Sequence, residues 1–128
     1  MKVKICGLTS HEQVKICVEN NADFCGFILN YPKSHRYISF DKANELTSIK
    51  KNKTNYVGVL VNPNENELIK FSKLNLEYLQ IYGNYSNKDI NDFKSKYKKK
   101  IIFAIQVKKQ KDVFHYEKIK DSADIVLW

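Results

Sequence analysis

Short apolar segments alternate with amphipathic segments along the whole 128-residue chain, and this alternation restricts the fold more than any other feature. Six segments have strand composition, and segments with helical spacing of apolar residues separate them at intervals of roughly 20 to 30 residues. The expected strands are residues 3–6, 24–29, 56–61, 78–82, 101–107 and 123–128. The expected helices are residues 10–20, 39–49, 65–74, 86–97 and 112–119. Thr9 or Ser10 is expected to cap the first helix, with a reciprocal acid or amide partner in Glu12 or Gln13, and Ser39 is expected to cap the second. This pattern predicts an α/β protein with a parallel sheet.

Two architectures fit such an alternation, an open doubly wound sheet and a closed (β/α)8 TIM barrel. No G-x-G-x-x-G motif follows the first expected strand, which removes the commonest reason to expect a dinucleotide-binding sheet. The barrel is therefore favoured. A complete barrel takes at least about 200 residues and eight units. We accordingly expect residues 1–128 to form a single partial barrel domain, truncated after its sixth strand.

The first expected strand carries an unusual pair of side chains. Lys4 and Cys6 lie on one face of this strand, whereas Val3 and Ile5 lie on the other, because successive residues alternate in direction. Gly7 then ends the strand. A lysine and a thiol that face inward suit a functional site better than a packed core. From the residues alone the alternative stays open that Cys6 is a small buried hydrophobic residue, as free cysteines usually are.

Composition narrows the function classes. The three cysteines form no C-x-x-C pair, which favours reduced thiols in the cytoplasm over a disulfide framework or a structural zinc site. The net charge of +8 comes from lysine, with Arg36 as the only arginine. Because nucleic-acid recognition usually uses arginine in a defined module, we expect a solvated lysine-rich surface and no nucleic-acid partner. No apolar run reaches the ~18 residues of a membrane span, so no membrane partner is expected.

Five blocks of sequence carry a family resemblance. They are V-K-I-C-G at residues 3–7, A-D at residues 22–23 with G-F at residues 26–27, Y-P-K-S at residues 31–34 followed by R-Y-I-S at residues 36–39, V-G-V at residues 57–59 with V-N at residues 61–62, and L-Q-I at residues 79–81 followed by Gly83. With these blocks in order, the chain resembles the N-terminal part of the phosphoribosylanthranilate isomerase family of tryptophan biosynthesis. The resemblance implies a TIM barrel with its site at the C-terminal ends of the strands. It also implies a small phosphosugar substrate and neither a cofactor nor a metal.

The family's reaction is an Amadori rearrangement, in which a general acid opens the ribose ring and a general base removes the proton from C2. By resemblance Cys6 is the base, with Lys4 as a source of positive potential beside it. Arg36 aligns with the family's ligand for the anthranilate carboxylate, although a surface arginine is the alternative. Gln80 and Tyr82 align with substrate-contacting positions. Tyr82 departs from the family pattern, which commonly has histidine there.

The family's general acid is an aspartate directly after the sixth strand, in the position that would follow Trp128. Asp124 lies at the opposite end of that strand and does not replace it. The loops of the last two strands form the phosphate site of such barrels. We therefore expect negligible isomerase activity from residues 1–128 alone. The chain is expected to be a fragment of a longer product, to associate with itself or with a C-terminal segment, or to be a non-catalytic remnant or partner-binding module that folds as an open sheet.

Overall fold

A computed structural model describes residues 1–128 as one six-stranded parallel sheet with the strand order β1-β2-β3-β4-β5-β6. The strands are β1 (Lys4–Cys6), β2 (Phe24–Ile28), β3 (Asn55–Val61), β4 (Tyr78–Tyr82), β5 (Lys100–Ala104) and β6 (Ile125–Leu127). The helices are α1 (His11–Glu19), α2 (Phe40–Thr47), α3 (Glu65–Ser72) and α4 (Asn87–Tyr97), with a 3₁₀ helix, η1 (Gln110–Lys118), between β5 and β6. The predicted α/β class with a parallel sheet is confirmed.

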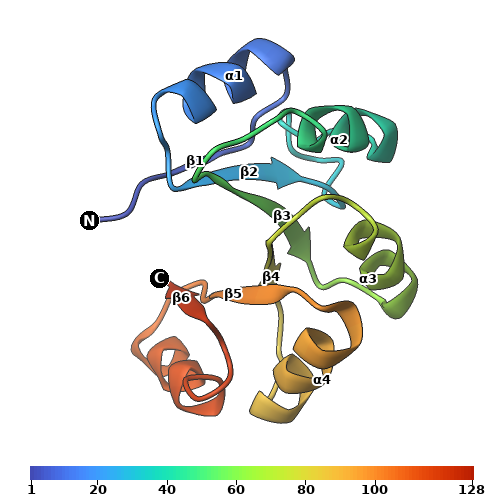
Figure 1. The fold of residues 1–128 in the computed structure, drawn as a ribbon. Helices are drawn as coiled ribbons and strands as arrows, with labels where there is room; N and C mark the ends of the chain where they lie inside the picture. Colours follow the sequence, from blue (N-terminus) through green and yellow to red (C-terminus); the bar gives the residue numbers. More distant parts are fainter.

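The sheet is curled, with the helices on its outer side (Figure 1). Each strand pairs with the next strand in the sequence, so the strand order never reverses. A doubly wound sheet has a reversal of strand order at its switch point, and this chain has none. Sequential parallel order with outer helices is the arrangement of barrel folds. The chain ends lie on the same open side of the curl in Figure 1.

The last helical segment differs from the prediction. An α-helix was expected over residues 112–119, whereas residues Gln110–Lys118 form a 3₁₀ helix. Val113, Phe114 and Tyr116 are poor helix formers, since β-branched and aromatic side chains lose rotamer freedom against the preceding turn. The fifth strand is also shorter than expected and ends at Ala104. Its expected last residues, 106 and 107, are exposed rather than paired in the sheet.

Polar caps start the helices where the sequence predicts them. The Ser10 hydroxyl accepts a hydrogen bond from the Gln13 amide at 3.3 Å, and the Ser39 hydroxyl accepts one from Lys42 at 3.2 Å. The Gln13 side chain returns to the backbone N–H of Thr9 at 2.8 Å rather than to Ser10. These bonds satisfy N–H groups that have no partner inside the helix. The caps fix where each helix begins relative to the strand before it.

Apolar side chains cover both faces of the sheet. A cluster of 22 buried residues fills the layer between the strands and the outer helices. On the inner face, Phe24, Val57, Tyr78 and Ile102 form a second cluster. Gly26 and Gln80 lie two residues further along β2 and β4, on the same inner face. On β4 the inner face thus changes from apolar at Tyr78 to polar at Gln80, and on β2 it loses its side chain at Gly26.

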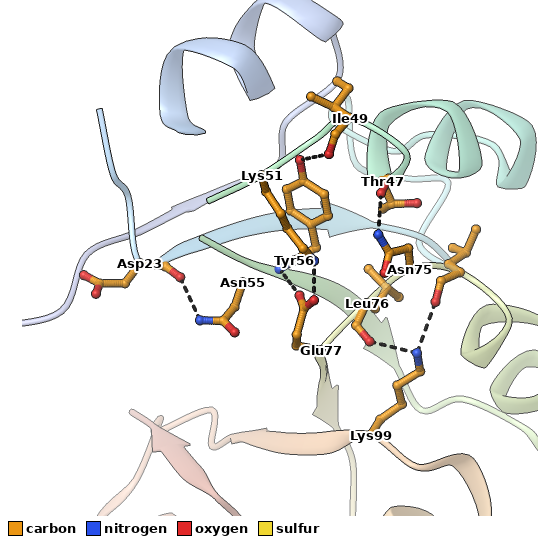
Figure 2. A network of polar contacts seen from close by, with 11 residues as sticks. Asp23, Thr47, Ile49, Lys51, Asn55, Tyr56, Asn75, Leu76, Glu77 and Lys99 are labelled. Atoms are coloured by element: carbon orange, nitrogen blue, oxygen red, sulfur yellow. Dashed lines mark hydrogen bonds and ion pairs between the residues drawn. The ribbon is translucent and has the colours of Figure 1, made fainter. Parts of the chain in front are cut away.

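The N-terminal ends of the strands are joined by a polar network (Figure 2). Glu77 is at its centre, because its carboxylate accepts the Tyr56 backbone N–H at 2.7 Å and forms an ion pair with Lys51. The Lys51 ammonium lies 4.2 Å from the centroid of the Tyr56 ring, and the Tyr56 hydroxyl donates to the Ile49 carbonyl at 2.9 Å. The network ties the segment before β3 to the residue before β4.

Two further charged residues have structural roles at this end. The Lys99 ammonium donates to the carbonyls of Leu74 at 3.1 Å and Leu76 at 2.8 Å, and burial lowers the pKa of Lys99 (Figure 2). The expectation of a solvated lysine-rich surface therefore does not hold for Lys99. Asp124 accepts the backbone N–H of Ile101 at 2.8 Å. Its place at the N-terminal end of β6 confirms that it does not belong to a site at the C-terminal ends.

We expect Glu77→Ala to lower the free energy of unfolding by about 1–3 kcal/mol, because the substitution leaves the Tyr56 N–H and the Lys51 ammonium without their acceptor. The measurement is urea denaturation. Glu65→Ala is the control, since Glu65 forms a more exposed ion pair with Lys96. An equal loss in both variants would contradict the structural role of Glu77.

The buried Cys25 thiol is expected to make the free energy of unfolding depend on pH. Burial, followed by the nearby Cys17, raises the pKa of Cys25 to about 12 from 9.0. The folded protein thus keeps a proton that the unfolded chain loses, so stability falls as the pH rises from about 9 toward 12. Burial raises the pKa of Tyr56 to about 12 as well, from 10.0, and adds to this loss. We expect Cys25→Ala to lose less stability over this range in urea denaturation. Parallel pH profiles of the variant and the unsubstituted protein would contradict the assignment.

Candidate functional site

Strand β1 presents Lys4 and Cys6 to the inner face of the sheet. Cys6 is in register with Gly26 of β2, and Lys4 is in register with Phe24 of the inner cluster. Both side chains are half-buried. The prediction that Lys4 and Cys6 share an inward face is therefore confirmed. Ile5, between them, is in register with Cys25 of the outer layer.

The absence of a side chain at Gly26 brings the lysine and the thiol together. A Cβ atom at Gly26 would lie 3.0 Å from Cys6 Sγ and 3.1 Å from Lys4 Nζ. The thiol and the ammonium thus both lie against the space that a side chain would fill. The role of Lys4 as a source of positive potential beside Cys6 stays a prediction.

Arg36 lies over the turn that follows β1. Gly7 has a φ of +80°, and a Cβ atom there would lie 2.7 Å from Arg36 Cδ. The Arg36 guanidinium donates from Nη1 to the Cys6 carbonyl at 3.0 Å, and the Gly7 N–H donates to the Gly26 carbonyl at 2.9 Å. A guanidinium has five N–H donors, so most remain available for an anion. Arg36 is exposed and is held next to Cys6 by its backbone contact.

Gln80 and Tyr82 form a second polar group on β4. Gln80 Nε2 donates to the Tyr82 hydroxyl at 3.3 Å. The Gln80 side chain is 2 % exposed, and its Oε1 atom has no hydrogen-bond partner. Buried polar atoms without a partner are uncommon in folded proteins. Gln80 Oε1 is thus an acceptor on the inner face that a bound donor can satisfy.

The structure separates the five predicted site residues into these two groups. Cys6, Lys4 and Arg36 meet at the C-terminal end of β1, whereas Gln80 and Tyr82 lie three strands away on β4. Three strand spacings amount to about 14 Å along the sheet. Both groups face the inside of the curl. A single ligand that touches both has to lie across the inner face of the curl.

Two residues that position the site were not assigned a role from the sequence. Gly7 was recognised only as the residue that ends the strand, and Gly26 only as part of a resemblance. The role of Gly7 depends on its positive φ and its contact with Arg36. The role of Gly26 depends on the register between β1 and β2. A single sequence contains no signal for either contact.

No group of three or more His, Cys, Asp or Glu side chains is arranged to hold a metal ion. None of the helices has the length and apolar character needed to cross a membrane.

Gly7→Ala tests the placement of Arg36. We expect it to lower the free energy of unfolding by about 1–2 kcal/mol, because an L-residue is strained at a φ of +80° and the new methyl group contacts Arg36. Gly26→Ala is the matched control, since its φ is not positive and its new contacts are with the ends of two side chains. Urea denaturation measures both. A larger loss for Gly26→Ala would contradict this account.

Comparison with known proteins identifies relatives of the chain. The family model "N-(5'phosphoribosyl)anthranilate (PRA) isomerase" matches residues 3–127. The N-(5'-phosphoribosyl)anthranilate isomerase of Streptococcus mutans is 34% identical over 128 residues, which cover 99% of this chain and 61% of the relative. The enzyme of the same name from Thermoanaerobacter is 37% identical over 122 residues, or 94% of this chain and 56% of the relative. The chain thus spans about three fifths of the length of these relatives.

Solved structures show the same likeness. Monomers derived from the dimeric phosphoribosylanthranilate isomerase of Thermotoga maritima superimpose with a TM-score of 0.85 at 30% identity, over 99% of this chain and 63% of theirs. A phosphoribosyl anthranilate isomerase in complex with reduced 1-(o-carboxyphenylamino)-1-deoxyribulose 5-phosphate gives a TM-score of 0.77 at 31% identity, over 88% of this chain and 57% of its own.

Proposed function

Because the chain belongs to the N-(5'-phosphoribosyl)anthranilate isomerase family, we propose that it serves the isomerisation of N-(5-phosphoribosyl)anthranilate to 1-(2-carboxyphenylamino)-1-deoxyribulose 5-phosphate in tryptophan biosynthesis. The observation that carries this proposal is the meeting of Cys6, Lys4 and Arg36 at the C-terminal end of β1. A relative that binds the reduced product supports the substrate class.

Cys6 acts as the general base. The reaction requires removal of the proton from C2 of the ring-opened ribose, which gives an enolamine that tautomerises to the ketone. A thiol serves this step only as its thiolate, because the neutral thiol is a far weaker base. Lys4 supplies positive potential at the thiol, and Gly26 leaves the space in which the two side chains meet. Lys4 is a positioning and electrostatic residue in this scheme.

Arg36 binds the anthranilate carboxylate. A planar guanidinium makes two parallel hydrogen bonds with a carboxylate, which fixes the plane of the attached ring. The hydrogen bond from Arg36 to the Cys6 carbonyl supports recognition of the carboxylate close to the proposed base. A substrate held by its carboxylate at Arg36 extends across the inner face. The Gln80 and Tyr82 pair then contacts it on β4, where the Gln80 Oε1 acceptor has no protein partner.

The sheet is also proposed to be part of a (β/α)8 barrel. Its sequential parallel order and its likeness to solved isomerases over about three fifths of their length support this proposal. The outer edges of β1 and β6 have no neighbouring strand in the sheet. Free strand edges favour pairing with further strands, either of the same protein or of a second copy.

Cys6→Ser tests the catalytic assignment. A serine hydroxyl is a far weaker base, so kcat of the natural gene product is expected to fall by about 10²–10⁴-fold, the usual contribution of a general base. Conversion of N-(5-phosphoribosyl)anthranilate, followed by chromatography, is the measurement. Cys17→Ser is the control, because Cys17 lies on α1 in the outer layer. Full activity of Cys6→Ser would overturn the proposed role and favour a non-catalytic function.

The carboxylate assignment is tested by binding, since we expect negligible turnover from residues 1–128 alone. Arg36→Met is expected to weaken binding of the reaction product by about 10- to 100-fold, as loss of a charge-assisted hydrogen bond is worth about 1.5–3 kcal/mol. Isothermal titration calorimetry is the measurement. Lys33→Met removes the same charge from the same loop and serves as control. Equal weakening in both variants would show that only the charge of the loop matters.

A further inference from the structure

Two of the three cysteines lie on elements that a short connection joins. Cys17 is in the last turn of α1, and Cys25 is the second residue of β2. Helix α1 lies on the outer side of the sheet, next to β1 and β2 (Figure 1). The Ala22 N–H donates to the Cys17 carbonyl at 3.0 Å, so the chain turns back from the helix toward the strand at once. The connection thus brings the two cysteines to the same side of the sheet.

The Cys25 side chain faces away from the candidate site. Cys25 is in register with Ile5 of β1 and with Tyr56 of β3, and it belongs with Tyr56 to the buried outer layer. Cys6, by contrast, lies against Gly26 on the inner face. The sheet therefore separates the Cys25 thiol from the Cys6 thiol.

Cys17 meets Cys25 from the helix. Cys17 is half-buried and packs against the cluster of 22 buried residues that contains Cys25. Val14 and Val18, which are buried on the same helix, belong to that cluster and hold α1 against the sheet. The Cys17 and Cys25 thiols are hydrogen-bonded to each other. A disulfide needs its sulfur atoms about 2 Å apart, so the two side chains have only a short distance to move.

The two thiols differ in their access to an oxidant. Burial, followed by the nearby Cys17, raises the pKa of Cys25 to about 12, so Cys25 keeps its proton at neutral pH and is unreactive by itself. Cys25 has no exposed surface, whereas Cys17 keeps part of its surface in solvent. An oxidant in solution therefore reaches Cys17 first.

We propose that Cys17 and Cys25 are an oxidisable pair that forms a disulfide between α1 and β2 when hydrogen peroxide is present. The Cys17 thiolate attacks one peroxide oxygen, the O–O bond breaks, and Cys17 becomes a sulfenic acid while the other oxygen leaves as hydroxide and takes up a proton. The Cys25 sulfur then bonds to Cys17 Sγ, and the hydroxyl group leaves with the Cys25 proton as water. The two thiols lose two electrons, and the peroxide is reduced to two waters.

The disulfide is reversible and adds a constraint to the fold. A reducing thiol such as glutathione opens it again, which agrees with the expectation of reduced thiols from the sequence. When closed, it forms a ring over residues 18–24 and restricts the unfolded chain. It also fixes the start of β2, the strand that carries Gly26, and leaves Cys6 a free thiol. The proposal does not depend on the isomerase activity.

Peptide mapping tests the link directly. The natural gene product is treated with hydrogen peroxide, denatured with N-ethylmaleimide present to block the remaining thiols, and digested with a protease that cleaves after glutamate. Cleavage after Glu19 separates the two cysteines, so a disulfide joins the peptide of residues 13–19 to that of residues 20–45. We expect mass spectrometry to find this linked pair and dithiothreitol to remove it. Cys17→Ser is expected to abolish the link, whereas Cys6→Ser, the matched control, is expected to keep it.

Thermal unfolding gives a second readout. Oxidation is expected to raise the melting temperature by about 3–10 °C, because a disulfide that fits the native geometry destabilises mainly the unfolded state. The rise is expected in Cys6→Ser and is expected to be absent in Cys17→Ser. The proposal is overturned if peroxide forms no link between Cys17 and Cys25, if Cys6 is a partner in the link, or if the oxidised protein melts no higher than the reduced protein.

Discussion

The parallel register between β1 and β2 is the constraint on which the candidate site depends. It sets Cys6 opposite Gly26, and the missing side chain at Gly26 is what lets the Lys4 ammonium lie beside the thiol. A shift of one residue would turn Lys4 and Cys6 toward the helices and bring Ile5 to the inner face. The register is fixed from both sides, because β2 is buried along nearly its whole length between the inner cluster and the outer layer. The site is thus a consequence of core packing.

The two ends of the strands have different physical roles. At the N-terminal ends, the charged side chains form hydrogen bonds with backbone groups and so contribute to the stability of the fold. These residues are Glu77, Lys99 and Asp124. At the C-terminal ends, Arg36 keeps free donors and Gln80 keeps a free acceptor. A ligand can bind where partly buried donors and acceptors have no hydrogen-bond partner within the protein. The N-terminal end of the sheet thus contributes stability, whereas the candidate site lies at the C-terminal ends of β1 and β4.

The sequence predicts much of this arrangement, and the features that it fails to predict have physical reasons. The alternation of segments fixes the class and the parallel sheet, and period-two spacing is sufficient to place Lys4 and Cys6 on one face. The capping serines can be recognised from the sequence, because helix capping depends only on residues a few positions away. The 3₁₀ form of η1 was missed, because weak helix propensity disfavours an α-helix without specifying which conformation replaces it. The positioning roles of Gly7 and Gly26 depend on contacts with residues about 20 to 30 positions away, which no local pattern encodes.

The most direct test of the central claim is a crystal structure of the protein with the reduced product, 1-(o-carboxyphenylamino)-1-deoxyribulose 5-phosphate. The quantity to measure is the distance from Cys6 Sγ to C2 of the sugar. The account predicts roughly 3–3.5 Å, the separation of a reactive pair, with the carboxylate on the Arg36 guanidinium. A ligand bound with C2 remote from Cys6, or with its carboxylate away from Arg36, would contradict the assignment of the site.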